Sequence, residues 1–202
     1  MLGLKKRGVK NPIYVHETAI IDSGAQIGIG TKIWHWTHVM DTAVIGEGCI
    51  IGQGCFIAGQ IGDWCKIQNS VNLFKGVVLE DEVFVGPGVT FTNVKRPRAN
   101  IEQKNKFLFT IIKKGATIGA GSIIICGITI GEAAFIGAGS VVTKSVPAGK
   151  TWCGNPAKRL IYIAYDCKHC VPVGMPCGEN VFYCFVRMYG RFDCKCEDYE
   201  KI

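Results

Sequence analysis

Two sets of polar side chains in this sequence could bind a ligand or act on it. The first is the histidines, of which His35 and His38 stand together in "IWHWTH", and an imidazole is the commonest general base in enzymes. The second is the basic segment "VKRPRANIEQKNKFLFT". Its Lys95, Arg96 and Arg98 could pair with a carboxylate or a diphosphate, and arginine suits such contacts because it can bind two oxygens at once. Plain exposure to solvent is the alternative interpretation of these charges.

Six of the eleven cysteines lie in the last 36 residues. Among them, Cys167, Cys170, Cys194 and Cys196 could hold a structural zinc ion, although the second pair has one spacer residue where zinc sites prefer two to four. We favour an aromatic-rich cap with reduced thiols, because disulfides are rare in a reducing cytosol.

An aliphatic residue recurs at every sixth position through most of the chain. The register runs over positions 15–57, resumes after a step of four at 61–91, and returns at 112–142. A helix repeats near 3.6 residues and a strand near 2, so neither explains a spacing of six. Twenty hexapeptides result, with one shortened unit and one insertion at about residues 95–111. Internal repeats of this kind predict a solenoid.

Each hexapeptide is expected to form a short strand followed by a corner. A small residue stands four positions after the aliphatic one, and Cys49, Cys55 and Cys65 take this slot, where they are predicted to be inert core thiols. Three strands would close a triangular coil of eighteen residues, stacked at ~4.8 Å. The predicted fold is therefore all-β, a parallel β-helix of six to seven coils with one inserted loop and a short Cys-rich C-terminal extension.

Composition divides the chain and limits its partners. We expect a basic segment at 1–11, the β-helix domain at 12–160 with its loop at 95–111, and a Cys- and aromatic-rich extension at 161–202. The net charge is +7, but no nucleic-acid motif accompanies it, and anionic small ligands account for much of it. Apolar runs are too short to span a membrane, and the N-terminus does not resemble a signal peptide. A cytoplasmic protein that binds neither nucleic acid nor membrane is expected.

The repeat resembles the left-handed β-helix, hexapeptide-repeat acyltransferases over roughly residues 12–160. More narrowly, "TKIWHWTHVM", "KIQNS", "LEDEVFVGPGVTFTNVKRPRA", "KKGATIGA" and "GNPAKR" resemble the bacterial UDP-2-acetamido-3-amino-2,3-dideoxy-glucuronate N-acetyltransferases. The resemblance implies a left-handed coil and a homotrimer with sites between subunits. It also implies transfer of acetyl from acetyl-CoA to the amino group of a nucleotide-linked sugar, with no metal required.

The resemblance also assigns residues to the acceptor site. Asn93, in the Phe-Thr-Asn element, is implied to be the catalytic residue that orients the amine or the thioester carbonyl. A corner residue tolerant of a left-handed turn is the alternative. His35 and His38 then become substrate contacts, together with Lys95 and Arg98. Two further substrate contacts, Gln68 and Asn69, match the family's Gln-Asn-Asn element, whose second Asn is Ser70 here.

The acetyl-CoA site is implied by the last coils. Backbone amides of "ATIGAG" and "AFIGAG" are expected to bind the pantetheine arm, and three basic side chains near the end of the coil are expected to meet the phosphates. The cofactor-binding set is Gly119, Ala120, Gly137, Ala138, Lys144, Lys158 and Arg159.

Counting hexapeptides in threes predicts which corner residues stack. One edge should carry His35, Gln53, Asn69, Pro87 and Ala120. The next should carry Asp41, Gly59, Lys75, Asn93 and Cys126. Residues on different edges could meet only across a subunit boundary, as the implied trimer requires.

Other functions remain open at this point. Within the same reaction, the acceptor could be a 3- or 4-amino-6-deoxyhexose linked to UDP or dTDP. A β-helix metalloenzyme of the carbonic-anhydrase type would need three converging metal histidines, and a non-catalytic scaffold would not need the Asn93 segment.

Overall fold

The computed structural model describes residues 12–103 and 106–160. These residues form no helix, so the described part of the chain has no helix that could span a membrane. The strands are β1 (Tyr14–Val15), β2 (Ile20–Ile21), β3 (Gln26–Ile27), β4 (Lys32–Ile33), β5 (His38–Val39), β6 (Val44–Ile45), β7 (Ile50–Ile51), β8 (Phe56–Ile57), β9 (Gln60–Ile61), β10 (Lys66–Ile67), β11 (Asn72–Leu73), β12 (Val77–Leu79), β13 (Phe84–Val85), β14 (Thr90–Phe91), β15 (Thr110–Ile112), β16 (Thr117–Ile118), β17 (Ile123–Ile124), β18 (Thr129–Ile130), β19 (Phe135–Ile136), β20 (Val141–Val142), β21 (Thr151–Cys153) and β22 (Lys158–Arg159).

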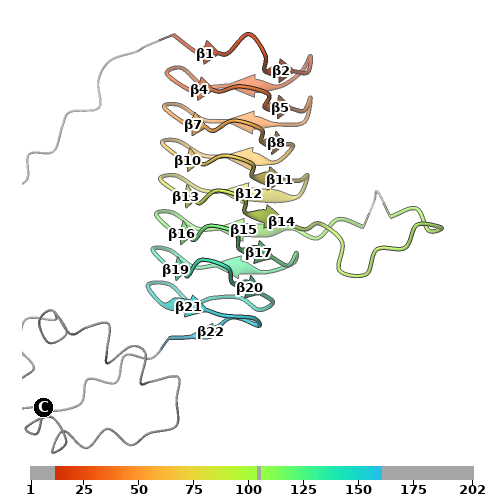
Figure 1. Cartoon of the computed structure of the whole chain (residues 1–202), viewed down its shortest axis with the longest axis vertical. Helices are drawn as coiled ribbons and strands as arrows, with labels where there is room; N and C mark the ends of the chain where they lie inside the picture. Colours follow the sequence, from red (N-terminus) through yellow and green to blue (C-terminus); the bar gives the residue numbers. More distant parts are fainter. Residues whose placement is uncertain (1–11, 104–105, 161–202) are drawn as a thin grey trace, which may run out of the picture. The chain divides into compact units, whose positions relative to one another are not determined.

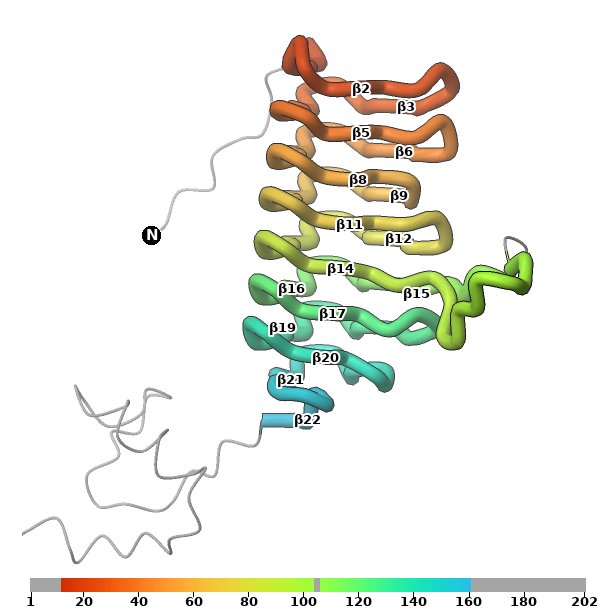
Figure 2. Tube along the Cα trace, turned by 45° about the vertical axis from the view of Figure 1, so that its right-hand side comes forward, coloured from red at the N-terminus to blue at the C-terminus, as the bar shows by residue number. Residues whose placement is uncertain are grey.

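These strands stack into three parallel sheets, as Figures 1 and 2 show. Sheet A follows the order β1-β4-β7-β10-β13-β16-β19-β21-β22, sheet B the order β2-β5-β8-β11-β14-β17-β20, and sheet C the order β3-β6-β9-β12-β15-β18. Among β1 to β20, strands three apart in the chain pair in parallel, so three consecutive strands make one coil. Beyond them, β21 pairs in parallel with β19, and β22 pairs antiparallel with β21. The twenty strands β1 to β20 confirm the twenty hexapeptides, and a bridge from Ile130 to Val146 extends sheet C by one level. The left hand of the coil stays a prediction of the resemblance.

The interior is a continuous aliphatic column. The last residue of each strand from β4 to β20 faces inward and is at most 3% exposed, as at Ile33, Ile67 and Ile136. The small slot is also filled as predicted, since Cys49, Cys55 and Cys65 are at most 2% exposed. Burial raises the pKa of the Cys55 thiol, which keeps it protonated and inert.

Glycine at the corners lets successive coils approach closely. A Cβ on Gly119 would lie 2.4 Å from the backbone nitrogen of Ala138 in the next coil, and one on Gly52 would lie 2.6 Å from Oδ1 of Asn69. Neither distance is possible for a real side chain, so these positions require glycine. The recurring Gly after the aliphatic residue is therefore explained by stacking.

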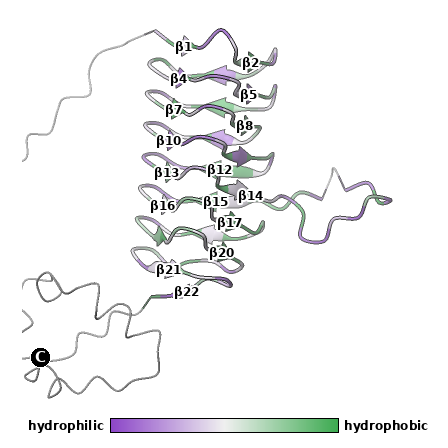
Figure 3. Cartoon of the chain, in the orientation of Figure 1, coloured by the Kyte–Doolittle hydropathy of each residue, from purple (hydrophilic) through white to green (hydrophobic). Residues whose placement is uncertain are grey.

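The insertion leaves the coil between β14 and β15 and projects from its side (Figure 1). Its hydrophilic stretches are visible in Figure 3. The predicted end at residue 111 is wrong, because Thr110 and Ile111 pair with Val77 and Val78 and belong to β15. Ile111 precedes the register residue Ile112, as in the other strands, and pairing with β12 adds Thr110 to the strand. The N–H of Leu108 donates to the carbonyl of Asn93 at 3.0 Å and closes the base of the loop.

The remaining predictions on chain organisation fall outside the described residues. These are the basic segment at 1–11 and the extension at 161–202, with its aromatic cap or its zinc site at Cys167, Cys170, Cys194 and Cys196.

Candidate functional site

Asn93 lies at the corner that follows β14, between sheets B and C, and is half-buried. Its carbonyl is held by Leu108, but its side-chain amide makes no hydrogen bond within the described part of the chain. The preceding Thr92 fixes the corner, because its hydroxyl accepts the N–H of Cys126 at 3.0 Å. Asn93 therefore presents a donor and an acceptor on a backbone anchored on both sides.

The basic side chains of the loop remain in solvent. Arg98 is exposed, and within the described part of the chain its guanidinium donates only to the neighbouring carbonyl of Pro97, at 3.4 Å. Lys95 reaches over Gly127, where its Cε lies 3.7 Å from the position a Cβ would take. Lys95 thus lies beside the coil that follows Asn93, whereas Arg98 is not brought to Asn93 by any contact the structure describes.

His35 and His38 do not converge, although they are only three positions apart in the sequence. His35 occupies the corner between sheets A and B, where its ring stacks on His16 at 3.5 Å. His38 lies on the outer face of β5, with its Nε2 3.0 Å from Oδ1 of Asp22 and its ring edge-on to Phe56. Along sheet B, β5 and β14 are three positions apart, about 14 Å at the usual strand spacing. Neither histidine therefore reaches Asn93 within one chain.

The corners between sheets A and B form a single column, which we call the A–B edge. The carbonyl of each member up to Ala120 accepts a backbone N–H from the next coil at 2.8–2.9 Å. The column runs His35, Gln53, Asn69, Pro87, Ala120 and Ala138. This confirms the predicted stack. Asn93 lies on the edge between sheets B and C, so it and Asn69 occupy different edges of one chain, as expected.

Asn69 has a structural task that sequence inspection missed. Its Oδ1 accepts the N–H of Gln53 at 3.1 Å and so caps the corner of the coil above. The same arrangement recurs at the edge between sheets C and A. There the N–H of Glu47 donates to Oδ1 of Asp63, and the N–H of Asp63 donates to Oδ1 of Asp81. An Asn or Asp stacked one coil after an unpaired corner amide is the signal that could have predicted these caps. Gln68, beside Asn69, is half-buried and leaves its side-chain amide unbonded among the described residues.

The predicted amides of the acetyl-CoA site divide into two kinds. The N–H groups of Gly119 and Gly137 are not available, because they donate to Ile136 and Trp152 at 2.8 Å each. Those of Ala120 and Ala138 make no hydrogen bond within residues 12–103 and 106–160, and both residues are exposed. Alanine offers no acceptor that could cap the coil above, so two free donors lie about 4.8 Å apart at successive levels. A ligand with spaced amide carbonyls could bind along them.

The three basic residues of the predicted phosphate site are exposed at the C-terminal end of the coil. Lys158 and Arg159 form β22, which pairs antiparallel with β21, whereas Lys144 follows β20 at another corner. Lys158 and Arg159 thus continue sheet A beyond the Ala138 corner, and Lys144 is set apart from them.

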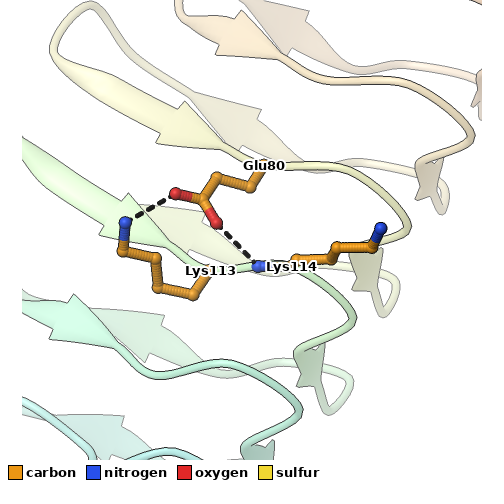
Figure 4. A network of polar contacts seen from close by, with 3 residues as sticks. All are labelled: Glu80, Lys113 and Lys114. Atoms are coloured by element: carbon orange, nitrogen blue, oxygen red, sulfur yellow. Dashed lines mark hydrogen bonds and ion pairs between the residues drawn. The ribbon is translucent and has the colours of Figure 1, made fainter.

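Glu80 uses both of its oxygens to join two coils (Figure 4). Oε1 lies 2.6 Å from Nζ of Lys113, and Oε2 accepts the N–H of Lys114 at 3.0 Å. The hydrogen bond from Lys113 holds the pKa of the Glu80 carboxyl below its ordinary value. Glu80 follows β12 and Lys113 follows β15, so this pair fastens the coil on either side of the inserted loop.

No three His, Cys, Asp or Glu side chains gather as a possible metal site among the residues that the structure describes.

Comparison with known proteins found a family model that matches the repeats and a relative that is similar over most of the β-helix. The bacterial transferase hexapeptide model, of six repeats, matches residues 24–59 and 109–144. A dTDP-3-amino-3,6-dideoxy-α-D-galactopyranose 3-N-acetyltransferase from Aneurinibacillus thermoaerophilus is 42% identical over 151 residues, which cover 74% of this chain and 78% of the relative.

Two further proteins share the coil but are longer. The bifunctional protein GlmU of Shouchella clausii is 31% identical over 154 residues, 69% of this chain, and the match spans only 34% of that relative. The acetyltransferase domain of PglB from Neisseria gonorrhoeae, solved with acetyl coenzyme A, superimposes with a TM-score of 0.50 and 25% identity over 76% of this chain and 60% of its own. The chain belongs to the hexapeptide-repeat acyltransferase family.

Proposed function

We propose that this protein transfers acetyl from acetyl-CoA to the amino group of a nucleotide-linked amino sugar. The observation that carries the proposal is the 42% identity to an N-acetyltransferase of a dTDP-3-amino sugar, which extends over most of both chains. The structural neighbour bound to acetyl coenzyme A supports the choice of donor. A cytoplasmic location goes with this proposal, because acetyl-CoA is an intracellular donor.

The reaction needs positioning more than proton removal. A sugar amine with a pKa of about 8, the value of an α-amino group, is partly neutral at pH 7, and the neutral form is a good nucleophile. Its nitrogen attacks the thioester carbonyl, the C–N bond forms, and the C–S bond breaks. The attacking nitrogen becomes positively charged when the C–N bond forms. It then loses a proton, which the leaving thiolate of CoA takes up. The protein must hold the two reactants together and stabilise the oxyanion that forms between these steps.

Asn93 is assigned to that task. Its unbonded side-chain amide can donate to the developing oxyanion or accept from the attacking amine, and its anchored backbone keeps it in place. Among the described residues, His35 and His38 lie about three levels from Asn93 within one chain, so neither is assigned as its base. Gln68, Asn69, His35 and His38 are assigned to the sugar nucleotide.

The site is assembled between subunits of a homotrimer. The A–B edge and Asn93 lie on different edges of one prism, so a site containing both requires a neighbouring chain. Acetyl-CoA runs along the free amides of Ala120 and Ala138 toward Lys158 and Arg159, with Lys144 as a further contact for its phosphates. Gly119 allows the close approach of Ala138, and Gly86 allows that of Ala120, whereas Gly137 packs against Cys153.

Two acceptors are supported by different observations. UDP-2-acetamido-3-amino-2,3-dideoxy-glucuronate is supported by the motifs quoted above and by Lys95 and Arg98, which could bind its carboxylate. A dTDP-3-amino-3,6-dideoxyhexose, which lacks the carboxylate, is supported by the relative from Aneurinibacillus thermoaerophilus.

A panel of amino-sugar nucleotides, assayed by CoA thiol release and product mass, tests the proposal and chooses between the acceptors. Replacing Arg98 by Gln should raise KM for the glucuronate alone if the loop binds its carboxylate, with the uncharged 6-deoxy acceptor as the matched control. Absence of transfer to every acceptor, with stoichiometric metal in the purified protein, would favour the carbonic-anhydrase type of metalloenzyme. Absence of both would favour a scaffold.

A further inference from the structure

Trp36 occupies a corner of the A–B edge that disfavours it. Its φ is +53°, in the left-handed region that bulky side chains rarely adopt. In the coils below, the equivalent corner is taken mostly by glycine, as at Gly54, Gly88 and Gly121. The side chain gains little in exchange, because Trp36 is 68% exposed, more than any other tryptophan among the described residues. A strained and exposed indole of this kind points to a function.

Trp64 provides a contrast within the same chain. It also has a positive φ, of +60°, at a corner between sheets C and A. Its ring, however, lies over Gly48, where a Cβ would come within 2.4 Å of the indole carbons. Packing on the coil above accounts for Trp64, whereas no glycine of residues 12–103 and 106–160 packs in this way against Trp36.

Trp36 is one member of an ordered group of rings. His16 and His35 stack at 3.5 Å, Trp34 lies nearly parallel to His35 with an interplanar angle of 10°, and the centroid of Trp36 is 5.6 Å from that of His35. Thr18, in the preceding coil, orients the group. Its hydroxyl accepts the N–H of Trp36 at 3.1 Å, and its own N–H donates to Nδ1 of His16 at 3.2 Å. We call His16, Trp34, His35 and Trp36 the ring platform.

We propose that the ring platform binds the nucleobase of the sugar nucleotide, an inference that rests on the proposed function. A nucleobase stacks on flat aromatic rings and carries polar edges that neighbouring donors and acceptors can meet. The ring nitrogens of His35 and the indole N–H of Trp36 are unbonded within the described residues and could serve this purpose. A purely apolar partner would leave these polar groups without a role.

The position of the platform fits the substrate. Trp36 precedes β5 and Asn93 follows β14, three levels or about 14 Å along the coil. In a trimer whose threefold axis is parallel to the coil, this axial separation is the same between neighbouring subunits. A nucleoside, two phosphates and a sugar ring can bridge it, which would place the base on the platform and the amine at Asn93 of the neighbour.

Acetyl-CoA also carries a base, but its adenine is expected elsewhere. The basic residues assigned to its phosphates include Lys158 and Arg159 of β22. In sheet A, β22 lies seven positions beyond β4, the strand that precedes Trp36. The platform therefore lies at the opposite end of the coil from this phosphate site.

Replacing Trp36 by glycine gives a direct test. Glycine already occupies the equivalent corners of other coils, and it adopts a positive φ without strain. We expect Trp36→Gly to keep the melting temperature within a few degrees and to weaken binding of UDP or dTDP on the order of 10- to 100-fold, as for loss of a base-stacking ring. Trp36→Phe should retain most of the affinity. Trp64→Gly, the matched control, should bind the nucleoside diphosphates as the wild type does. Isothermal titration calorimetry on the full chain measures all four proteins.

The opposing results are distinct. Unchanged affinity for UDP and dTDP in folded Trp36→Gly overturns the platform, and it leaves the proposed function intact if the wild type still acetylates an amino-sugar nucleotide. Weaker binding of acetyl-CoA with unchanged binding of nucleoside diphosphates also overturns it, because the base would then be adenine. A wild type that binds neither UDP nor dTDP overturns the platform, and the proposed function falls with it only if acetyl transfer is absent too.

Discussion

The two ends of the A–B edge are built from the same corner but expose different chemistry. At the N-terminal end the corners carry rings and amide side chains, as at His35, Gln53 and Asn69. There the N–H of Gln53 is capped by the side chain of Asn69. At the C-terminal end, Ala120 and Ala138 expose uncapped backbone N–H groups.

This difference suggests a division of labour between side chains and backbone. Side chains vary in shape and can select one sugar and one base, which suits the acceptor. Backbone amides vary little and suit a donor such as acetyl-CoA that many enzymes share. The repeat supplies the same frame at both ends, so the residue at each corner and the residue one coil away decide which groups each end offers to a ligand.

Asn93 lies at a level between the two ends, and its replacement should have the largest effect. Asn93→Ala is expected to lower kcat on the order of 10²-fold, as for loss of one oxyanion-hole donor, with little change in the melting temperature. Steady-state kinetics with both substrates varied would measure it. A kcat within threefold of the wild type would remove Asn93 from the mechanism.

Substitutions at the N-terminal end should change the kinetic constants for the acceptor and leave those for acetyl-CoA unchanged. We expect His35→Asn to raise KM for the sugar nucleotide about tenfold through lost stacking, and to leave KM for acetyl-CoA unchanged. Both His35→Asn and His38→Asn should retain measurable kcat. His38 in particular faces Asp22 and not Asn93. A fall in kcat beyond roughly 10³-fold for either variant would identify a general base and overturn the mechanism without one.

The C-terminal end can be tested by deleting one backbone donor. Proline already occupies the A–B edge at Pro87, so Ala138→Pro should fit the corner while removing its N–H. Loss of one hydrogen bond predicts an increase in KM for acetyl-CoA of about 2- to 10-fold, with KM for the sugar nucleotide unchanged. Ala138→Ser keeps the N–H and is the control. Equal KM values for acetyl-CoA in the proline and serine variants would contradict a role for this amide.

The smallest effect is expected at Glu80, which stabilises the coil and lies on neither half of the edge. Because its folded-state pKa is lowered, the ion pair stabilises the protein above the ordinary glutamate pKa of about 4.3, and this contribution disappears as the pH falls through the folded-state pKa. Glu80→Gln should cost below about 1 kcal/mol at pH 7, since both side chains are partly exposed. Melting curves at pH 7 and pH 3 should differ from wild type only at the higher pH. An equal loss at both values would mean that packing, and not charge, is the cause.

Periodicity predicted the fold and much of the geometry of the candidate site. The six-residue spacing predicted all twenty strands and the stacking of His35 on the same edge as Ala120, because coil closure leaves one register that buries the sixth-position aliphatic residues from Ile33 onward. It also predicted that Asn69 and Asn93 lie on different edges. The end of the insertion was wrong because pairing with β12, which places Thr110 in a strand, is a tertiary effect.

The roles of individual corner groups were harder to predict. Gly119 and Gly137 were expected to offer free amides, yet these groups bond the next coil, and only the alanines after them are unpaired. The stacking of His16 on His35 depends on rotamers and on the Thr18 contacts, which no spacing rule contains. Repeats therefore predict position well, whereas hydrogen bonding at each position depends on the residue one coil away.

Mass spectrometry of the reaction product is the most direct test of the central claim. The full chain would be incubated with acetyl-CoA and, separately, with UDP-2-acetamido-3-amino-2,3-dideoxy-glucuronate and a dTDP-3-amino-3,6-dideoxyhexose, with free thiol measured in parallel. The account predicts that one acceptor gains a single acetyl group on its amine, in step with the release of one equivalent of CoA thiol. Release of thiol at the same rate with and without an amino sugar, with no acetylated product, would contradict it.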